Sequence, residues 1–378
     1  MTYKISAIMP VYNTENFLSR SIECVLNQTL KDFELIIVND GSTDNSSTII
    51  EKYASCDSRI KVINKNNQGL GYARNSGLEY ATGEYIFFID SDDTIEINTF
   101  EELYLIAIKN DPDIIVFNMK KILEDNNEVI QDEVLKLKNE TINISDIGVN
   151  CYFEEYFFPY IHGHEACNKL YKHDFIKLSK VIFDSNDYIC AEDLMFNIKL
   201  LPFLDKITTI NKSYYNYYQR SNSIMNSGYR NNLIERFTNL VEEYNMYLIN
   251  NGFYGLDDEI SVLYYTLLSS TLYNEEISKG NKISTYYNIL KYTRSNLCKK
   301  YLKCIAISSR CSNLLGAYGM KSYSVYIIKL FCISCYINIG LGSLVWYLYI
   351  NITRFFYDKC KNYKNNTKEQ ILSNKIEK

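Results

Sequence analysis

The sequence predicts an α/β fold with a mostly parallel sheet that carries helices on both faces, followed by a C-terminal helical region. Over roughly the first 120 residues, short apolar runs alternate with amphipathic helical stretches, which is typical of strands joined by helices. Polar and acidic residues follow several of the runs, and spacings after residue 233 are mostly helical. Open α/β sheets bind ligands beyond the carboxyl ends of their strands, so we expect the functional site there.

The expected elements follow from the spacing of apolar residues. Strands are expected at 4–11, 33–39, 60–64 and 85–89, and helices at 16–28 and 71–80. The turn from Asp40 to Asp44 supplies glycine for tight backbone geometry and Ser, Thr and Asp for capping. Asp44 and Asp93 are both interpreted as helix caps. The tyrosine-rich stretch 214–218 is interpreted as a packed strand rather than a surface that stacks on bases.

The remaining segments suggest two domains. Periodicity weakens and charges increase from 120 to 150, which we interpret as an excursion from the sheet. Order resumes at 168–171, and a helical pattern follows Glu192 and Asp193. We place a domain boundary near Gly228, which gives domains of 1–228 and 229–378.

Composition excludes some functions. The chain has 378 residues, a net charge of -5 and a pI near 5.5. No nucleic-acid partner is expected, because binding a phosphate backbone requires a basic face. Eleven scattered cysteines and an N-terminus without a secretory pattern predict a cytoplasmic protein with reduced thiols. The CxxC pair Cys332 and Cys335 lies in an apolar run and is interpreted as packing.

Two acidic clusters are the candidate chemistry. Asp90 and Asp92 follow the strand 85–89 and, being two residues apart, can face one pocket. Oxygen ligands suit a hard cation such as Mg²⁺ or Mn²⁺, which commonly bridges carboxylates to phosphates. The pattern therefore predicts a phosphorylated ligand. Glu192 and Asp193 are a candidate base pair, although acids are also favoured at any helix N-terminus by its dipole.

Four motifs in order resemble the GT-A-fold glycosyltransferases of family 2, whose fold is Rossmann-like. They are SAIMPVYN at 6–13, VNDGSTD at 38–44, NQGLGYARN at 67–75 and FIDSDD at 88–93. The resemblance extends more weakly through 168–171, Glu192-Asp193 and 217–223, and so covers roughly the first 230 residues. Members of this family build capsules, teichoic acids and other bacterial surface glycans.

The resemblance implies a role for each matching residue. It implies that several of these residues bind the donor. Those near the nucleotide base are Pro10, Tyr12 and Asn13, and Asp40 would hydrogen-bond its uracil-type edge. Arg74 would lie near the base and the phosphates, and Asp90 and Ser91 at or beside the ribose. Asp92 would hold the metal as the second aspartate of a DXD motif, Mn²⁺ or Mg²⁺ being the cofactor. Asp193 would be the general base, and Glu192 an acceptor-binding or supporting group. Arg220 and Ser223 would contact the diphosphate, and Lys169 is the weakest match.

The implied function is metal-dependent, inverting transfer of a sugar from a UDP-sugar to a hydroxyl of a glycan or lipid-linked acceptor, in surface polysaccharide synthesis. Two alternatives remain: a non-catalytic sugar-nucleotide-binding subunit that supports a partner transferase, and a nucleotidyltransferase. The second would be expected to show a glycine-rich basic loop where this chain has Tyr12-Asn13-Thr14-Glu15. His162 and His164 could suggest a metal site, but a loop role is favoured because ligand partners are lacking at suitable spacing.

The tail contains an uncharged apolar segment, Leu330 to Ile350, with Asn338, Gly340 and Gly342 in its middle. Basic residues flank it on both sides: Lys321, Lys329, Arg354, Lys359, Lys361 and Lys364. This pattern predicts that 323–364 lies on the inner face of the cell membrane as a peripheral surface element. Internal packing and a true span are the alternatives.

Overall fold

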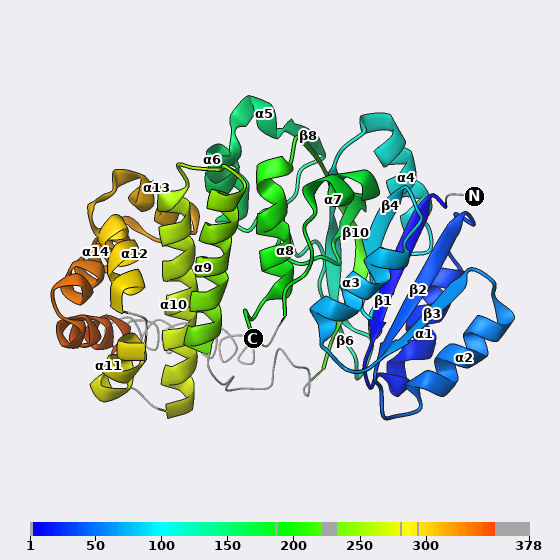
Figure 1. Ribbon diagram of the computed structural model, residues 1–378, viewed down its shortest axis with the longest axis horizontal. Helices are drawn as coiled ribbons and strands as arrows, with labels where there is room; N and C mark the ends of the chain where they lie inside the picture. The colour runs from blue at the N-terminus through cyan, green and yellow to red at the C-terminus, as the bar shows by residue number, and fades with distance from the viewer. Residues whose placement is uncertain (1–2, 186–187, 221–232, 280–281, 293–294, 352–378) are drawn as a thin grey trace, which may run out of the picture. The chain divides into compact units, whose positions relative to one another are not determined.

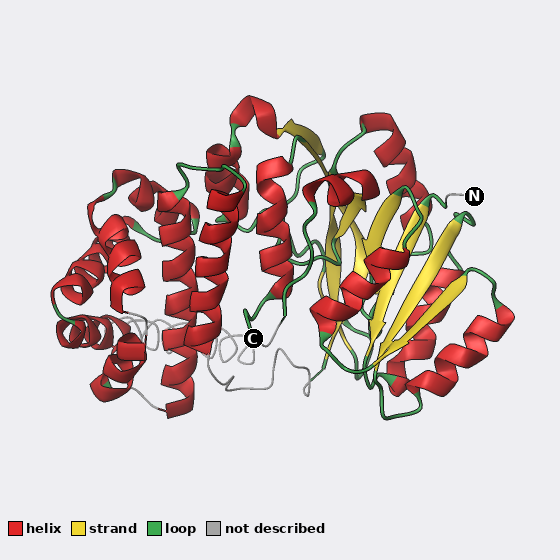
Figure 2. Cartoon of the chain, viewed as in Figure 1, coloured by secondary structure: helices red, strands yellow, loops and turns green. Residues whose placement is uncertain are grey.

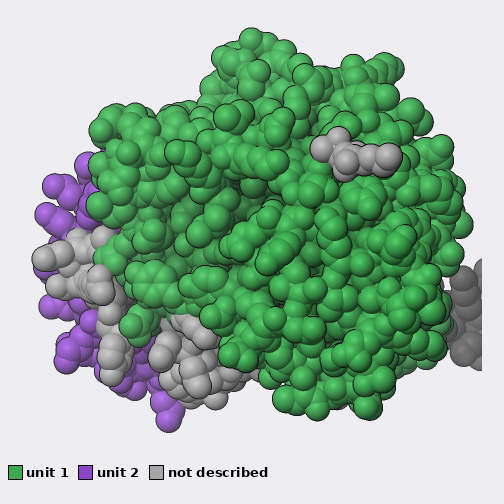
Figure 3. All heavy atoms as spheres, turned by 45° about the vertical axis from the view of Figure 1, so that its right-hand side comes forward, with its two compact units in different colours: residues 1–256 green, residues 257–378 purple. Residues whose placement is uncertain are grey.

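The computed structural model describes residues 3–185, 188–220, 233–279, 282–292 and 295–351 (Figure 1). The chain forms two compact units, Met1–Leu256 and Asp257–Lys378, which are coloured separately in Figure 3. The boundary predicted near Gly228 lies outside the described residues. The first described helix after it belongs to the first unit.

The first unit begins with the predicted alternation of strands and helices. Its elements are β1 (Ile5–Val11), α1 (Glu15–Leu26), β2 (Phe33–Asp40), α2 (Ser46–Cys56), β3 (Ile60–Lys65), α3 (Leu70–Tyr80) and β4 (Tyr85–Phe88). Then follow β5 (Thr94–Ile95), α4 (Thr99–Asn110), β6 (Ile114–Leu123), β7 (Val129–Gln131), β8 (Glu140–Asn143), α5 (Ile144–Ile147), α6 (Val149–Tyr152) and a π-helical turn (Phe153–Phe157). The unit ends with β9 (Lys169–Lys172), α7 (His173–Ser179), α8 (Glu192–Leu200), a 3-10 turn (Leu201–Phe203), β10 (Lys206–Gln219) and α9 (Leu233–Asn250).

These strands, yellow in Figure 2, form one mixed sheet. Their order is β3-β2-β1-β4-β9-β6-β10-β5. The strands β1 to β4 are parallel, and β10 runs parallel to β6. The strand β9 is antiparallel to both of its neighbours, β4 and β6. The carboxyl ends of β1, β2 and β4 therefore share one edge of the sheet, as the sequence predicts.

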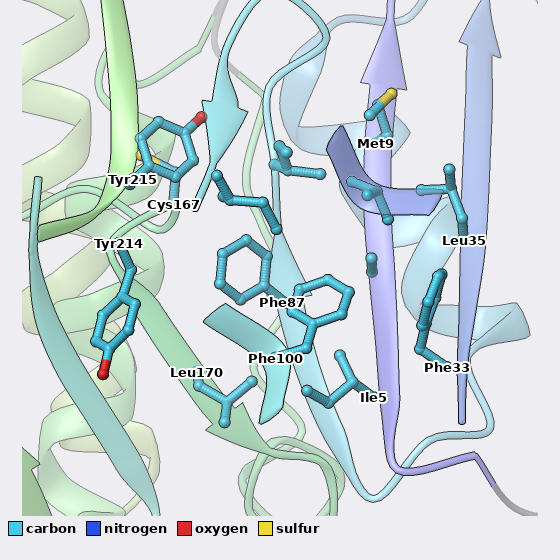
Figure 4. Packing of buried hydrophobic residues seen from close by; sticks show 14 of the residues in the cluster. Ile5, Met9, Phe33, Leu35, Phe87, Phe100, Cys167, Leu170, Tyr214 and Tyr215 are labelled. Atoms are coloured by element: carbon cyan, nitrogen blue, oxygen red, sulfur yellow. The ribbon is translucent and has the colours of Figure 1, made fainter. Parts of the chain in front are cut away.

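Helices cover both faces of the sheet. Successive side chains of a strand point to opposite faces, and in the central strands the side chains on both faces are mostly apolar. Ile5, Ala7 and Met9 of β1 belong to the core cluster that also contains buried residues of α1, α2 and α4. On the other face, α3 packs on β1 and β2. Its Gly77 lies so close to Ile8 that an added Cβ would be 2.4 Å from Ile8 Cγ2. In the core cluster, the rings of Phe87 and Phe100 meet edge to face at 5.3 Å (Figure 4).

The prediction of an excursion from the sheet at 120–150 was wrong. The strand β6 continues to Leu123, β7 pairs with β6, and β8 pairs with β10. All residues of β7 are exposed, and Ile142 is the buried residue of β8. Edge segments that bury so little need no apolar alternation, which is why the sequence pattern did not reveal them.

The tyrosines at 214–218 lie in β10, and the packing interpretation is confirmed for the first two. Tyr214 and Tyr215 are adjacent, yet both are buried, so both faces of this strand are covered here. Their hydroxyl groups donate hydrogen bonds to two different carboxylates. Tyr214 donates to Glu102 Oε2 at 2.6 Å, and Tyr215 donates to Asp93 Oδ2 at 2.8 Å.

The second unit is helical, as predicted for the C-terminal region. It contains α10 (Asp257–Lys279), α11 (Ile283–Tyr292), α12 (Ser295–Ile307), α13 (Ser309–Ala317), α14 (Ser322–Ile337) and a further helix at 339–351. Helix α12 packs against α10 and α14. Cys332 and Cys335 are buried, in agreement with the packing interpretation. Within the described residues, no helix combines the length and apolar character needed to cross a bilayer.

Candidate active site

Two polar turns at the carboxyl edge of the sheet are held by hydrogen bonds to each other and to the next helix. Asp40, the last residue of β2, is buried and accepts hydrogen bonds from the backbone N–H groups of Gln68 (3.1 Å) and Gly69 (2.8 Å). Asn13 adopts a left-handed conformation with φ 53° and accepts a bond from the Thr43 backbone at 2.8 Å. These contacts fix the loops that follow β1, β2 and β3.

The predicted donor-binding residues near these turns differ in how exposed they are. Pro10 is buried within β1, whereas the Tyr12 side chain is half exposed. The Ser91 hydroxyl accepts a hydrogen bond from Thr14 Oγ1 at 3.1 Å. Tyr12 therefore offers an open aromatic ring beside the turn, while Ser91 helps to hold the segment after β4 against the β1 loop.

Arg74 connects three carboxylates that come from distant parts of the chain. Its side chain, on α3, is almost fully buried. The guanidinium lies 3.1 Å from Asp90 Oδ1 and 3.2 Å from Glu192 Oε1, and it also pairs with Asp193. One cation thus faces three acids, so the cluster is acidic in balance and holds four of the predicted site residues together.

The backbone before this acidic pair is in an unusual conformation. Cys190 and Ala191 have φ values of 35° and 74°, which cost of order 1–3 kcal/mol for non-glycine residues. Two hydrogen bonds then fix Asp193 at the start of α8. Its Oδ2 accepts from Ala166 N at 3.1 Å, and Asn197 donates to its backbone carbonyl at 2.9 Å. The backbone before α8 is therefore strained, and this strained turn places the Asp193 carboxylate beside Arg74.

The surroundings of Asp193 adapt it to accept a proton near neutral pH. Burial raises the pKa of Asp193 to about 7; Arg74 opposes the rise, and Glu192 and Asp90 add to it. A general base is most effective when its pKa is close to the working pH. The geometry and the pKa of Asp193 both suit such a base.

Asp92 pairs with Arg220, which follows β10, and not with Arg74. Its backbone carbonyl accepts a hydrogen bond from Arg20 at 2.8 Å. The side chains of Asp90 and Asp92 are 32% and 28% exposed, so both carboxylates are accessible. Such oxygen ligands suit a hard divalent cation. In the structure the Asp92 carboxylate is paired with the positively charged Arg220 side chain. Ser223 lies outside the described residues.

The two aspartates interpreted as caps behave differently. Asp44 Oδ1 accepts from the backbone N–H of Ser46, the first residue of α2, at 3.0 Å, so Asp44 satisfies one donor at this helix start, although the N-cap residue itself is Asn45. Asp93 is buried and accepts from Tyr215 Oη (2.8 Å) and from the backbone of Tyr218 (2.9 Å). The cap assigned to Asp93 was wrong, because the short strand β5 follows it and its carboxylate anchors β10 instead.

The two histidines lie in the loop at 162–166, and Lys169, the first residue of β9, contacts that loop. Lys169 is buried and donates to the carbonyl of Glu165 at 2.6 Å; burial lowers its pKa to about 8. His162 is buried beside the Tyr152 hydroxyl at 2.8 Å, and burial lowers its pKa to about 3. In the part of the chain that the structure describes, three metal-ligating side chains converge only in the second unit. The loop role favoured for His162 and His164 therefore agrees with the structure.

Some residues that shape the site were not identified from the sequence. The hydroxyl of Tyr215 accepts a hydrogen bond from the backbone N–H of Asp90 at 3.2 Å. Arg20 donates to the backbone carbonyl of Asp92. Arg20 resembles any basic residue on an exposed helix face, so no signal marked it. Tyr215 stood in a recognised tyrosine run, and only the pairing of β10 with β5 shows which tyrosine reaches the acidic segment.

Comparisons with known proteins identify the family. The sequence profile described as Glycosyl transferase family 2 matches residues 6–163. The chain is 33% identical over 252 residues to the putative glycosyltransferase EpsH of Bacillus subtilis (strain 168), covering 66% of this chain and 71% of EpsH. The chain belongs to glycosyltransferase family 2. It is therefore a glycosyltransferase.

Solved structures support the GT-A fold of this family 2 member. The crystal structure of an S. aureus TarS fragment matches with a TM-score of 0.66 at 20% identity, covering 92% of this chain and 91% of that one. The same fragment in complex with UDP-GlcNAc matches with a TM-score of 0.58 at 20% identity, covering 86% and 90%. At this identity the likeness shows the fold alone. The GT-A prediction, with a helical region after it, is confirmed.

The raised pKa of Asp193 predicts the pH dependence of the glycosyltransferase. If Asp193 is the general base, the rate of nucleoside diphosphate release at low donor concentration should fall as pH decreases through about 7, because a protonated Asp193 cannot accept a proton. Glu192→Gln removes a negative charge that raises the pKa of Asp193, so the acidic limb of the pH–rate profile should move to lower pH. Glu101→Gln, on the exposed side of α4, is the control and should leave the limb in place. A rate that stays constant from pH ~5 to 8 would contradict the assignment.

Proposed function

We propose that the chain catalyses metal-dependent, inverting transfer of a sugar from a UDP-sugar to a hydroxyl of a glycan or lipid-linked acceptor in surface polysaccharide synthesis. The observation that carries the proposal is the cluster of Arg74, Asp90, Glu192 and Asp193, which holds a carboxylate with a pKa of about 7 at the carboxyl edge of the sheet.

Asp193 acts as the general base in this proposal. It takes the proton from the acceptor hydroxyl while that oxygen attacks the anomeric carbon, and the bond to the diphosphate breaks on the opposite side. Direct displacement of this kind inverts the configuration. A positioned base contributes typically about 10²–10⁴-fold to the rate. Arg74 orients the carboxylate, and Glu192 shares the same guanidinium. In this proposal Glu192 supports the base or contacts the acceptor.

The leaving diphosphate is met by Arg220 and by the accessible acids after β4. Arg220 reaches Asp92, and its guanidinium is suited to bidentate contact with phosphate oxygens. Mn²⁺ or Mg²⁺ bound by Asp92, with Asp90 nearby in sequence, would supply positive charge against the diphosphate as the glycosidic bond breaks.

The uridine half of the donor fits the first two turns of the sheet edge. The half-exposed Tyr12 ring supplies a stacking surface, and Asn13, Asp40 and Pro10 lie at or next to these turns. The fragment of TarS that shares this fold was crystallised in complex with UDP-GlcNAc, which supports a uridine nucleotide as donor. UDP-GlcNAc is accordingly the first donor to test.

A pair of substitutions tests the proposed roles. Asp92→Asn should lose both Mn²⁺-dependent tightening of UDP-GlcNAc binding and UDP release in the presence of acceptor. Asp193→Asn should bind the donor with Mn²⁺ almost normally, yet lose transfer by about 10²–10⁴-fold, because only the base is removed. Calorimetry measures the first property and UDP release the second. Asp125→Asn, an exposed acid outside the cluster, is the matched control.

Each contrary result has a defined meaning. Metal-dependent UDP release by Asp92→Asn would remove Asp92 as the metal ligand. Loss of donor affinity together with activity in Asp193→Asn would make Asp193 structural. Donor binding without turnover by the unaltered chain, across a panel of acceptors, would favour the non-catalytic subunit. Release of pyrophosphate would favour a nucleotidyltransferase.

We further propose that the enzyme works in the cytoplasm as a peripheral protein on the inner face of the cell membrane. The charge distribution supports this proposal. From residue 277 to 357 there are eleven Lys or Arg residues and no Asp or Glu, although the whole chain has 40 basic and 45 acidic residues. A basic segment near an anionic bilayer gains about 1 kcal/mol per Lys or Arg at the surface.

An apolar stripe in the same segment provides the contact. Along α14 the exposed residues Tyr323, Tyr326, Leu330, Ile333 and Ile337 recur at helical spacing, so they share one face. Leu341, Leu344 and Leu348 are the exposed leucines of the helix that follows. The opposite side of α14 is occupied by packing, with Phe331 against Trp346 at 5.1 Å. Tyrosine is favoured at membrane interfaces.

Substitutions on this stripe test membrane binding without removing packed residues. Tyr326→Glu with Ile337→Glu should reduce binding to phosphatidylglycerol-containing vesicles by tenfold or more in sedimentation, because each places a carboxylate at the apolar contact. The control is Ile97→Glu with Leu178→Glu, at equally exposed apolar positions of the first unit. UDP-GlcNAc binding should be unchanged in both.

Two results would contradict the membrane proposal. Binding of the stripe variant equal to that of the control would show that the stripe is not the contact. A change in oligomeric state on substitution, without vesicle binding by the unaltered chain, would assign the stripe to contacts between copies of the protein.

A further inference from the structure

A cluster of potential metal ligands lies in the second unit, where three helices converge. Asp258 is in the first turn of α10, Cys304 is near the end of α12, and Cys311 is in the first turn of α13. Both thiols approach one oxygen, Asp258 Oδ1, at 3.0 Å from Cys304 Sγ and 3.3 Å from Cys311 Sγ. One ligand atom from each residue lies within 4.8 Å of the others.

The separations are close to those of a tetrahedral zinc site. With Zn–S near 2.3 Å and Zn–O near 2.0 Å, neighbouring S and O ligands are about 3.5 Å apart and two sulfurs about 3.8 Å apart. The observed S–O distances, 3.0 Å for Cys304 and 3.3 Å for Cys311, are shorter than this by about 0.5 and 0.2 Å. Rotation of the side chains, without movement of the helices, can therefore open the cluster enough for an ion.

The chemistry of the ligands favours zinc over the cations expected at the donor site. Two thiolates and one carboxylate form a softer set than the all-oxygen acids at Asp90 and Asp92, and thiolates select Zn²⁺ rather than Mg²⁺ or Mn²⁺. The Ser308 hydroxyl caps α13 and accepts from Cys311 N at 3.3 Å, so a water or this hydroxyl is available for the fourth position.

Without a metal the two thiols stay protonated, because burial and the nearby Asp258 raise the pKa of Cys304 and of Cys311. Binding of Zn²⁺ would therefore displace two protons, as is usual for thiolate ligands. Three anionic ligands with Zn²⁺ carry a net charge of about -1. The basic excess of the surrounding segment offsets that charge. The neighbouring Arg310 forms its own pair with the buried Glu259 at 2.8 Å.

We propose that Asp258, Cys304 and Cys311 bind one Zn²⁺ ion that ties α10, α12 and α13 together. The site is structural and separate from the cation proposed at Asp92. A metal that joins three helices contributes its binding free energy to folding, because the unfolded chain does not present the site. Bound zinc should therefore raise the thermal midpoint of the second unit.

Metal analysis of the full chain tests the proposal. Protein purified without chelator under reducing conditions should contain about one zinc per chain by mass spectrometry. Cys304→Ser with Cys311→Ser should lose it, whereas Cys56→Ser, at an exposed thiol of the first unit, should keep it. Because the double variant could fold poorly, the unaltered chain is also stripped with a chelator and titrated with Co²⁺. Thiolate-to-cobalt charge-transfer absorption at one equivalent is expected, with recovery of the thermal midpoint on adding Zn²⁺.

Three outcomes would overturn the proposal. The chain could contain no zinc and show no cobalt–thiolate absorption. It could bind zinc equally with and without Cys304 and Cys311, which would indicate adventitious binding elsewhere. Intact-mass analysis could show the loss of two hydrogens at this pair, which would assign the thiols to a disulfide. None of these outcomes would bear on the proposed sugar transfer, which is measured separately as UDP release.

Discussion

The contact of one buried arginine with three carboxylates is the interaction on which the candidate active site depends. Arg74 reaches them because α3 packs tightly on β1 and β2, where Gly77 leaves room for Ile8. The strand β4 delivers Asp90, and the strained turn before α8 delivers Glu192 and Asp193. A buried charge is tolerated only when it is paired, and removing one partner typically costs about 3–5 kcal/mol. The same contacts that stabilise this arrangement also orient the proposed base.

Local sequence was sufficient to predict the first half of the sheet. The strands at 4–11, 33–39, 60–64 and 85–89 are apolar runs followed by turn residues, and each match is local. The position of β9 between β4 and β6 could not be predicted, because it is set by pairing between segments distant in the sequence. The edge strands β7 and β8 were missed since they bury too little to require a pattern.

The site residues show the same division between local and distant information. The acidic motifs after β4 and at the start of α8 were recognised from their residues, and the structure brings Asp90 and Asp193 to the same guanidinium. The depth of Arg74 was not predictable, because an arginine on a helix is usually at the surface. Asp93 was misread as a cap for a related reason. Its true partner, Tyr215, lies on a strand that begins more than a hundred residues later.

Arg74 balances the charge of three carboxylates, one of which, Asp193, is the proposed base. A double-mutant cycle of Arg74→Gln and Glu192→Gln tests this balance most directly, with hydrogen exchange of the α8 amides as the measure of local stability. We predict that Arg74→Gln alone lowers that stability by about 3–5 kcal/mol, because it leaves carboxylates unpaired. Adding Glu192→Gln should recover part of the loss, with a coupling of about 0.5–3 kcal/mol. Strictly additive effects, or no loss in Arg74→Gln, would contradict the account.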